Sequence, residues 1–98
     1  MMSQLNIVEF FAKDQASATT LLDILGGREP MRKEAGCHKF EQYVDQDDPN
    51  HLICIGHWPS RKQSEAFLKW ALAQPEQEAF EACLASPTRN IWLGEVEV

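Results

Sequence analysis

The sequence is short of basic residues, paired cysteines and long apolar runs, and each shortage excludes a class of protein. Nine Lys and Arg against fifteen Asp and Glu give a net charge of −6, the wrong sign for a surface that neutralises phosphates or anionic lipid. We therefore expect neither nucleic acid nor membrane as a partner. The three cysteines form no Cys-x-x-Cys motif, and the N-terminal stretch lacks the basic flank and apolar core of a signal peptide. These features predict a reduced, cytoplasmic protein without a transmembrane span.

Motifs for metal binding and nucleophilic catalysis are also missing. His38, His51 and His57 form no His-x-x-x-His or His-x-His pair, and the cysteine spacing does not match that of zinc ligands. The acidic residues at 45–48 lack the Glu that completes a calcium loop, because Gly56 stands at that position. No Gly-x-Ser-x-Gly motif occurs. We expect no metal site, and we interpret the cysteines as packing residues.

What the sequence does contain is a regular succession of strand and helix patterns. Its 98 residues, 44% of them hydrophobic and without a linker-like stretch, predict one domain over residues 1–98. Residues 5–11 are β-branched and aromatic, as in a strand. Asp14 is placed to cap a helix, and Gly26 and Gly27 can end it by adopting positive φ. The apolar stripe of this helix is Ala18, Leu21, Leu22 and Leu25.

The second half of the chain changes period twice. Residues 37–44 and 51–58 predict an antiparallel hairpin, joined by turn-forming residues at 45–50. Ser60, with Gln63 three residues on, has the spacing of a helix-capping box. The apolar stripe of the helix that follows is Phe67, Trp70, Ala71, Phe80, Cys83 and Leu84.

Proline residues divide the rest of the chain. Pro75 breaks or kinks the helix that starts after Ser60, and Pro87 ends its stripe. Residues 90–98 alternate in hydropathy and predict a closing strand.

The predicted order is βαββαβ, which is an α+β, ferredoxin-like arrangement. In this fold a four-stranded antiparallel sheet carries both helices on one face. Strand residues such as Ile53 and Ile55 then leave an uncovered apolar patch on the other face. We therefore predict that two sheets pack face to face in a homodimer.

Aromatic residues provide the only pattern for a binding site. Trp58 ends the second hairpin strand, Phe67 and Trp70 lie on the next helix, and Gly56 shares a strand face with Trp58 and leaves space beside it. Space beside an indole can hold a flat ligand. The alternative is that the tryptophans fill the core between sheet and helix.

The histidines add little to this site. His57 points to the face opposite Trp58, toward the predicted dimer interface. His38 shares the parity of Phe40, but the sequence leaves its face open.

The order of certain motifs resembles that of a known family, and the residues that carry the likeness are Gly36, Cys37, Phe40, the turn at 47–50, Trp58 and Ser60. The chain resembles the antibiotic biosynthesis monooxygenase superfamily of dimeric α/β barrels from about Leu5 to Leu93. The resemblance implies a small homodimer. It also implies oxidation of phenolic or quinol-like substrates by dioxygen with neither metal nor flavin, whereas a related branch degrades haem.

The resemblance also implies site residues. Trp58 matches the tryptophan of the family's third strand, and Asn6 matches an asparagine of its first strand. The helical histidine that ligates haem in the related branch has no counterpart, because residues 60–84 contain no His. The glutamate that often precedes the tryptophan by two residues is Gly56 here. Haem degradation by that mechanism is therefore not expected.

The sequence thus favours a cofactor-independent monooxygenase acting on a small aromatic, phenolic or quinol-like substrate. In this hypothesis Asn6 hydrogen-bonds the substrate oxygen, and Trp58 and Trp70 shape and dry the cavity together with Phe67. His38 is the proposed proton acceptor, with an ordinary strand histidine as the alternative. The competing hypotheses are a non-catalytic barrel that binds a small apolar metabolite, and a haem-binding relative.

Overall fold

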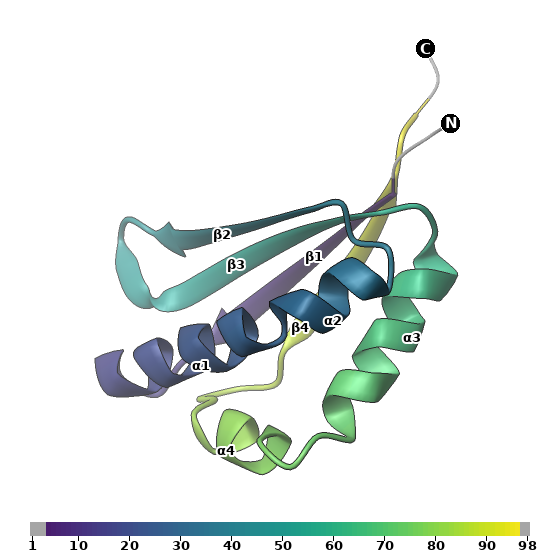
Figure 1. Ribbon diagram of the computed structural model, residues 1–98. Coiled ribbons are helices and arrows are strands. Elements are labelled where there is room, and N and C mark those ends of the chain that lie inside the picture. Colours follow the sequence, from purple (N-terminus) through teal and green to yellow (C-terminus); the bar gives the residue numbers. More distant parts are fainter. Residues whose placement is uncertain (1–3, 97–98) are drawn as a thin grey trace.

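A four-stranded antiparallel sheet with the helices packed on one face forms the protein (Figure 1). The computed structural model describes residues 4–96. Its strand order, β2-β3-β1-β4, confirms the predicted ferredoxin-like arrangement. Within residues 4–96, no helix is both long and apolar enough to cross a membrane. The elements are β1 (Gln4–Phe11), α1 (Gln15–Gly27), α2 (Glu29–Glu34), β2 (Lys39–Asp45), β3 (Asp48–Trp58), α3 (Arg61–Leu72), α4 (Gln77–Ala82) and β4 (Arg89–Gly94).

The strand register aligns one row of residues that matters for the site. Asn6 of β1 lies opposite Gly56 of β3 on one side and Trp92 of β4 on the other. Phe40 of β2 lies opposite Gly56 from the far side. Side chains of such a row project to the same face of a sheet, because strands alternate with period two. This face is the one that the helices cover.

Both predicted helix caps are confirmed. The backbone N–H of Ser17 donates to Asp14 Oδ1 at 2.8 Å, and that of Gln63 donates to Ser60 Oγ at 3.2 Å. Each bond satisfies a donor that the first helical turn leaves free. The two caps therefore fix where α1 and α3 begin beneath the sheet.

The end of α1 differs from the prediction. The helix ends at Gly27, but neither glycine adopts positive φ; Gly36 is the glycine with positive φ (109°) among the described residues. Arg28 joins α1 directly to a short helix, α2, which the sequence did not predict. Pro30 lies in the first turn of α2, where its missing N–H costs nothing.

The other boundaries shift by a few residues. β2 begins at Lys39 instead of residue 37, and β3 begins at Asp48 instead of residue 51, so the hairpin turn is shorter than predicted. The break at Pro75 is confirmed, because α3 ends at Leu72 and α4 is a separate helix.

The closing strand is also shorter than predicted. β4 ends at Gly94, and Glu95 and Val96 follow it outside the strand. Residues 97–98 of the predicted strand lie outside the described residues.

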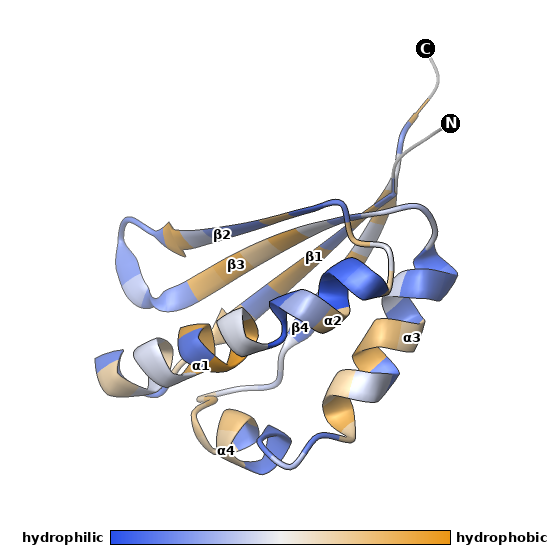
Figure 2. Cartoon of the chain, viewed as in Figure 1, coloured by the Kyte–Doolittle hydropathy of each residue, from blue (hydrophilic) through white to orange (hydrophobic). Residues whose placement is uncertain are grey.

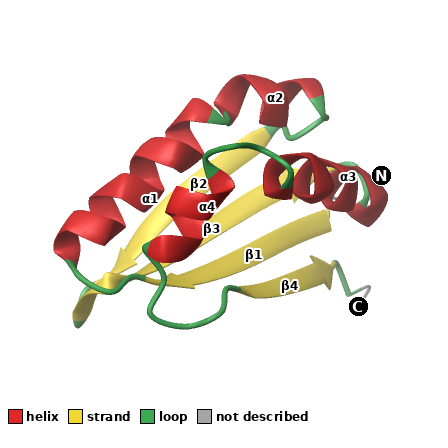
Figure 3. Cartoon of the chain, turned by 90° about the horizontal axis from the view of Figure 1, so that it is seen from below, coloured by secondary structure: helices red, strands yellow, loops and turns green. Residues whose placement is uncertain are grey.

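The core lies between the sheet and the helices. Apolar segments of β1 and β3 face apolar segments of the helices (Figure 2), and a view from below shows the helices lying across the sheet (Figure 3). Phe10 and Phe80 meet edge to face, with ring centres 5.3 Å apart, and Leu21 is fully buried beside them. These contacts hold α1 and α4 against one half of the sheet.

The opposite face of the sheet has no helix over it (Figure 1). Ile53 and Ile55 lie there, as predicted, and are only half-buried. His57 also lies on this face, as predicted, and its Nε2 is 2.6 Å from Glu41 Oε1. The aliphatic residues of this open face are Leu5, Ile7, Ile53, Ile55, Ile91 and Leu93.

Candidate functional site

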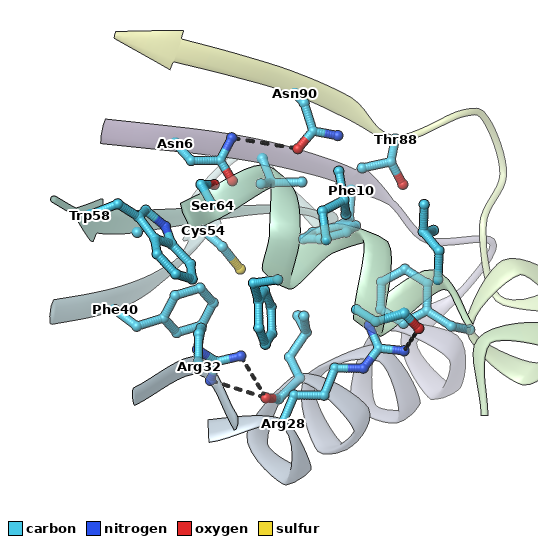
Figure 4. Close-up of a pocket in the computed structure, with 18 of the residues that line it drawn as sticks. Asn6, Phe10, Arg28, Arg32, Phe40, Cys54, Trp58, Ser64, Thr88 and Asn90 are labelled. Carbon is cyan, nitrogen blue, oxygen red and sulfur yellow. Dashed lines mark hydrogen bonds between the residues drawn. The ribbon is translucent and has the colours of Figure 1, made fainter. Parts of the chain in front are cut away.

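A cavity of about 170 Å³ lies between the helix-covered face of the sheet and the helices (Figure 4). An engineered apolar cavity of about 150 Å³ binds benzene, so this volume suits a ligand of one aromatic ring. The walls are mainly apolar, as is usual for small-molecule sites. The polar side chains on them are Asn6, Arg28, Arg32, Ser64, Gln77, Thr88 and Asn90.

Trp58 and Gly56 form one wall of the cavity. Trp58 is 3% exposed and lies at the last position of β3. A Cβ atom at Gly56 would lie 2.6 Å from Trp58 Nε1, which is too close for any side chain to fit. The space predicted at Gly56 therefore exists, but the indole occupies it. Both residues line the cavity, as the sequence predicted.

Asn6 lines the same wall from β1. Its Nδ2 donates to Ile91 O at 3.3 Å and to Asn90 Oδ1 at 3.5 Å, which ties β1 to β4. Both hydrogen bonds are at the long end of the usual range, so a closer ligand oxygen can compete for this donor. Asn6 thus presents an amide donor at the cavity wall.

The aromatic residues of α3 divide between cavity and exterior. Phe67 lines the cavity, with its ring centre 5.6 Å from that of Trp58. Trp70 does not line it, and its half-buried ring lies 5.6 Å from Phe67. Three residues turn a helix by roughly 300°, so Trp70 projects from a different side of α3. For Trp70, the alternative of a packing residue fits better than a substrate contact.

The structure shows where His38 lies, which the sequence left open. This side chain is exposed and lies outside the cavity, in a neighbouring hollow that shares Arg32 and Phe40 with the cavity. β2 begins only at Lys39, so His38 precedes the strand whose alternation would have turned it toward the helices. Its ring lies 6.2 Å from that of His57. His38 therefore does not line the cavity.

Two arginines that the sequence analysis did not identify also line the cavity. Arg28 precedes α2 and Arg32 lies within it, and they are 6% and 4% exposed. The sequence of the segment Glu29–Glu34 is rich in acidic and basic residues, a pattern typical of a helix face exposed to solvent, so it did not indicate a buried arginine. The one available signal was the spacing of four residues between the arginines, which puts both on the same side of a helix.

Arg32 is held by a carbonyl group and aromatic rings. Its Nη1 and Nη2 each donate to Leu25 O at 3.1 Å. The guanidinium carbon lies 3.7 Å from the ring centre of Phe40 and 5.9 Å from that of Phe67, which is cation–π geometry. Burial lowers the pKa of Arg32, but an arginine stays charged in proteins.

Cys54 is the third titratable group on the cavity wall. The side chain is 1% exposed, and burial raises the pKa of the thiol to about 12, so it is neutral at physiological pH. This agrees with the prediction of a packing cysteine. No His, Asp, Glu or Lys is found among the described residues that line the cavity. Over residues 4–96, no group of three His, Cys, Asp or Glu is placed to hold a metal ion.

Comparison with known proteins places this geometry in a family. The model of the antibiotic biosynthesis monooxygenase family matches residues 4–83. No curated protein matches the chain significantly.

Several solved structures share the fold. The crystal structure of an antibiotic biosynthesis monooxygenase has a TM-score of 0.72 and 24% identity, covering 96% of this chain and 99% of that one. A dimeric ferredoxin-like protein from an uncultured marine organism has a TM-score of 0.77 and 9% identity, covering 100% and 91%. SnoaB, a cofactor-independent oxygenase from Streptomyces nogalater, has a TM-score of 0.71 and 13% identity, covering 98% and 95%.

These likenesses establish the fold, and the family match extends over most of the chain, including the strands that carry Asn6 and Trp58. The protein therefore belongs to the antibiotic biosynthesis monooxygenase family.

Proposed function

We propose that the protein is a cofactor-independent monooxygenase that oxidises a small phenolic or quinol-like ring with dioxygen. The observation that carries the proposal is the mainly apolar cavity, with Asn6 and Trp58 on its wall and the volume of one ring. SnoaB, which shares the fold, is a cofactor-independent oxygenase. An apolar cavity suits this chemistry because it excludes the water that would intercept reactive intermediates.

The reaction balances without an external reductant. A phenolate passes one electron to dioxygen, and the resulting phenoxyl radical and superoxide combine to form a C–O bond. Loss of water from the peroxide then gives a quinone. One oxygen atom enters the product and the other leaves as water, and the substrate supplies all four electrons that dioxygen gains.

The residues of the chain position and protect the substrate. Asn6 Nδ2 donates a hydrogen bond to the substrate oxygen as charge develops there. Trp58 and Phe67, whose rings are tilted by 39°, pack against the substrate ring and keep water out. None of Asn6, Trp58 and Phe67 transfers a proton in this scheme.

We further propose that the protein acts as a homodimer. The open face of the sheet carries a patch of half-buried isoleucine and leucine, which a second copy would cover. A dimeric ferredoxin-like protein shares the fold.

Oxygen uptake by the purified protein tests the proposed activity. The substrates are a panel of single-ring hydroquinones and phenols, with a tricyclic anthrone for comparison. We expect uptake with single-ring substrates, and a loss of roughly 10²-fold in kcat for Asn6→Ala, the usual effect of removing a donor to a developing oxyanion. Trp58→Phe should also lower uptake, whereas Trp70→Phe, a matched change outside the cavity, should leave it unchanged.

Absence of uptake with every substrate would refute the activity. If flat aromatic ligands then still raise the Tm, the protein is a non-catalytic binding barrel. That alternative is favoured by the lack of a proton acceptor among the described cavity residues. Haem binding has less support, because none of those residues is a histidine that could ligate the iron.

A further inference from the structure

We propose that Arg32 is the counter-charge for an ionised oxygen on the bound ring, so that the ligand is a single-ring aromatic anion. The proposal deepens the proposed function and rests on the same cavity. A phenolate and a ring carboxylate share this chemistry, and the test below distinguishes them.

Arg32 is a buried cation with no carboxylate of the described residues in direct contact; Glu29, the neighbour of opposite charge on the same helix, acts on it only from beyond ion-pair distance. Arg32 is 4% exposed, and its Nε has no hydrogen-bond partner among the described residues. None of the ion pairs that Lys and Arg form with carboxylates among residues 4–96 includes it. Burying an unpaired charge costs a protein several kcal/mol, on the order of the whole free energy of folding. The cost of burying the Arg32 guanidinium indicates that this charge has a function.

Arg28 shows that the fold can supply a carboxylate to a buried arginine. Arg28 is buried to a similar degree, and its Nε lies 3.5 Å from Glu76 Oε1. Its Nη2 also donates to Gln77 Oε1 at 2.9 Å. Arg32, one helical turn further on, has only the carbonyl oxygen of Leu25 and two aromatic rings. The cavity is thus bordered by one neutralised arginine and one that is not.

The position of Arg32 suits recognition of a ring that carries an oxyanion. Phe40 and Phe67, the rings beside its guanidinium, also line the cavity. A ligand ring that packs against them brings a substituent oxygen to the guanidinium, which is a strong donor to anionic oxygens. Figure 4 shows Arg28 and Arg32 at one end of the cavity and Asn6 and Asn90 at the other. On a bound ring, Arg32 therefore contacts the ionised oxygen, and Asn6 contacts a second oxygen on the opposite side of the ring.

The cavity also lacks any group that could remove a proton from a substrate. The described residues on its wall include no carboxylate or imidazole, and the thiol of Cys54 is protonated at neutral pH. A nearby cation achieves the same result by another route, because it lowers the pKa of an acid within about 4–6 Å by roughly one to three units. The substrate proton then goes to water, and Arg32 keeps the substrate ionised.

Arg32 also stabilises the end of α1 through Leu25 O, so the test must separate charge from structure. Arg32→Gln keeps an N–H donor for that carbonyl and removes the charge. Lys33→Gln is the matched control, because Lys33 is an exposed cation on the same helix whose Nζ lies 3.3 Å from Glu29. Binding of benzoate and of its neutral analogue benzamide is measured by calorimetry for each protein.

We expect the wild-type protein and Lys33→Gln to bind benzoate at least tenfold more tightly than benzamide. In Arg32→Gln this ratio should fall to about one, with benzamide affinity changed less than threefold. In a second arm, 4-nitrophenol reports its own ionisation by its yellow colour. Bound to the wild-type protein, its pKa should fall by about one unit or more, and in Arg32→Gln it should return to the value in water.

Equal affinities for benzoate and benzamide together with an unshifted nitrophenol pKa would overturn the proposal, as would a preference for anions that survives in Arg32→Gln. A preference seen only with benzoate assigns a carboxylate ligand, and a shift seen only with nitrophenol assigns a phenolate. If Arg32→Gln does not fold, Arg32→Met takes its place, and the benzoate-to-benzamide affinity ratio of the wild-type protein still tests the proposal. Because these measurements need no turnover, failure of oxygen uptake refutes the proposed activity and not the anion site, whereas equal binding of anion and neutral analogue by the wild-type protein refutes the anion site and not the activity.

Discussion

At the scale of single residues, the position of the Trp58 indole depends on the absence of a side chain at Gly56. The indole nitrogen would lie 2.6 Å from a Cβ atom there, closer than Cβ atoms approach other groups. We predict that Gly56→Ala displaces the indole and lowers the free energy of unfolding by about 1–3 kcal/mol, the usual effect of overpacking. Urea denaturation measures this change, and calorimetry with a ring ligand measures the accompanying loss of affinity.

Gly94→Ala is the control for this change. A Cβ atom at Gly94 meets nothing within 4 Å, and the residue ends an exposed part of β4. Its stability should stay within about 0.5 kcal/mol of wild type. Equal effects of the two substitutions would show that Gly56 matters only through its backbone.

The cavity residues show which positions the sequence could predict. Trp58 and Asn6 were found through their resemblance to family positions, and Gly56 through strand alternation, which holds along the whole of β3. The side on which His38 lies could not be predicted, because alternation applies only within a strand and the sequence does not define where β2 begins. Arg32 was missed because its burial comes from packing against distant Phe40 and Phe67, which no local pattern shows.

At the scale of elements, α3 begins at a side-chain cap that orients Phe67 toward the cavity. Ser60 Oγ accepts from the backbone N–H of Gln63 at 3.2 Å and donates to Gln63 Oε1 at 3.0 Å. We predict that Ser60→Ala lowers the free energy of unfolding by about 1 kcal/mol. Denaturant unfolding measures it, and Ser60→Asp, which keeps an acceptor at the cap, should retain most of the stability. A loss as large for Ser60→Asp as for Ser60→Ala would contradict the assigned cap.

The long elements could be predicted because hydrophobic period, caps and prolines agree over β1, α1, β3 and α3. α2 could not be predicted, because six residues are too few to show a helical period. A helix that short is also unstable alone and depends on tertiary contacts, here those of Arg32 with α1 and with Phe40. The sequence thus failed to predict α2 because contacts with residues distant in the sequence stabilise this helix.

At the scale of the whole molecule, the two faces of the sheet differ in cover. The helices bury the face that holds the cavity, and the open face remains half-buried at best. A chain of this size hides only roughly 60–65% of the surface that it exposes when unfolded, so its stability is small and an additional interface raises it. Two pairs of polar side chains border the apolar patch. His57 contacts Glu41, and His51 Nδ1 lies 3.0 Å from Asp45 Oδ2.

We predict that Ile55→Asp dissociates the proposed homodimer and unfolds the subunits together. Ile55 lies in the middle of the patch, opposite Ile7 in the register, so a carboxylate there would be left unpaired in an apolar interface. Light scattering after size exclusion gives the mass, and circular dichroism gives the fold. Leu22→Asp is the matched control: Leu22 is 36% exposed on α1, on the helix side, and its replacement should leave a dimer. A folded dimer of Ile55→Asp would mean that the subunits associate through another surface, and then the open face has no partner of this kind.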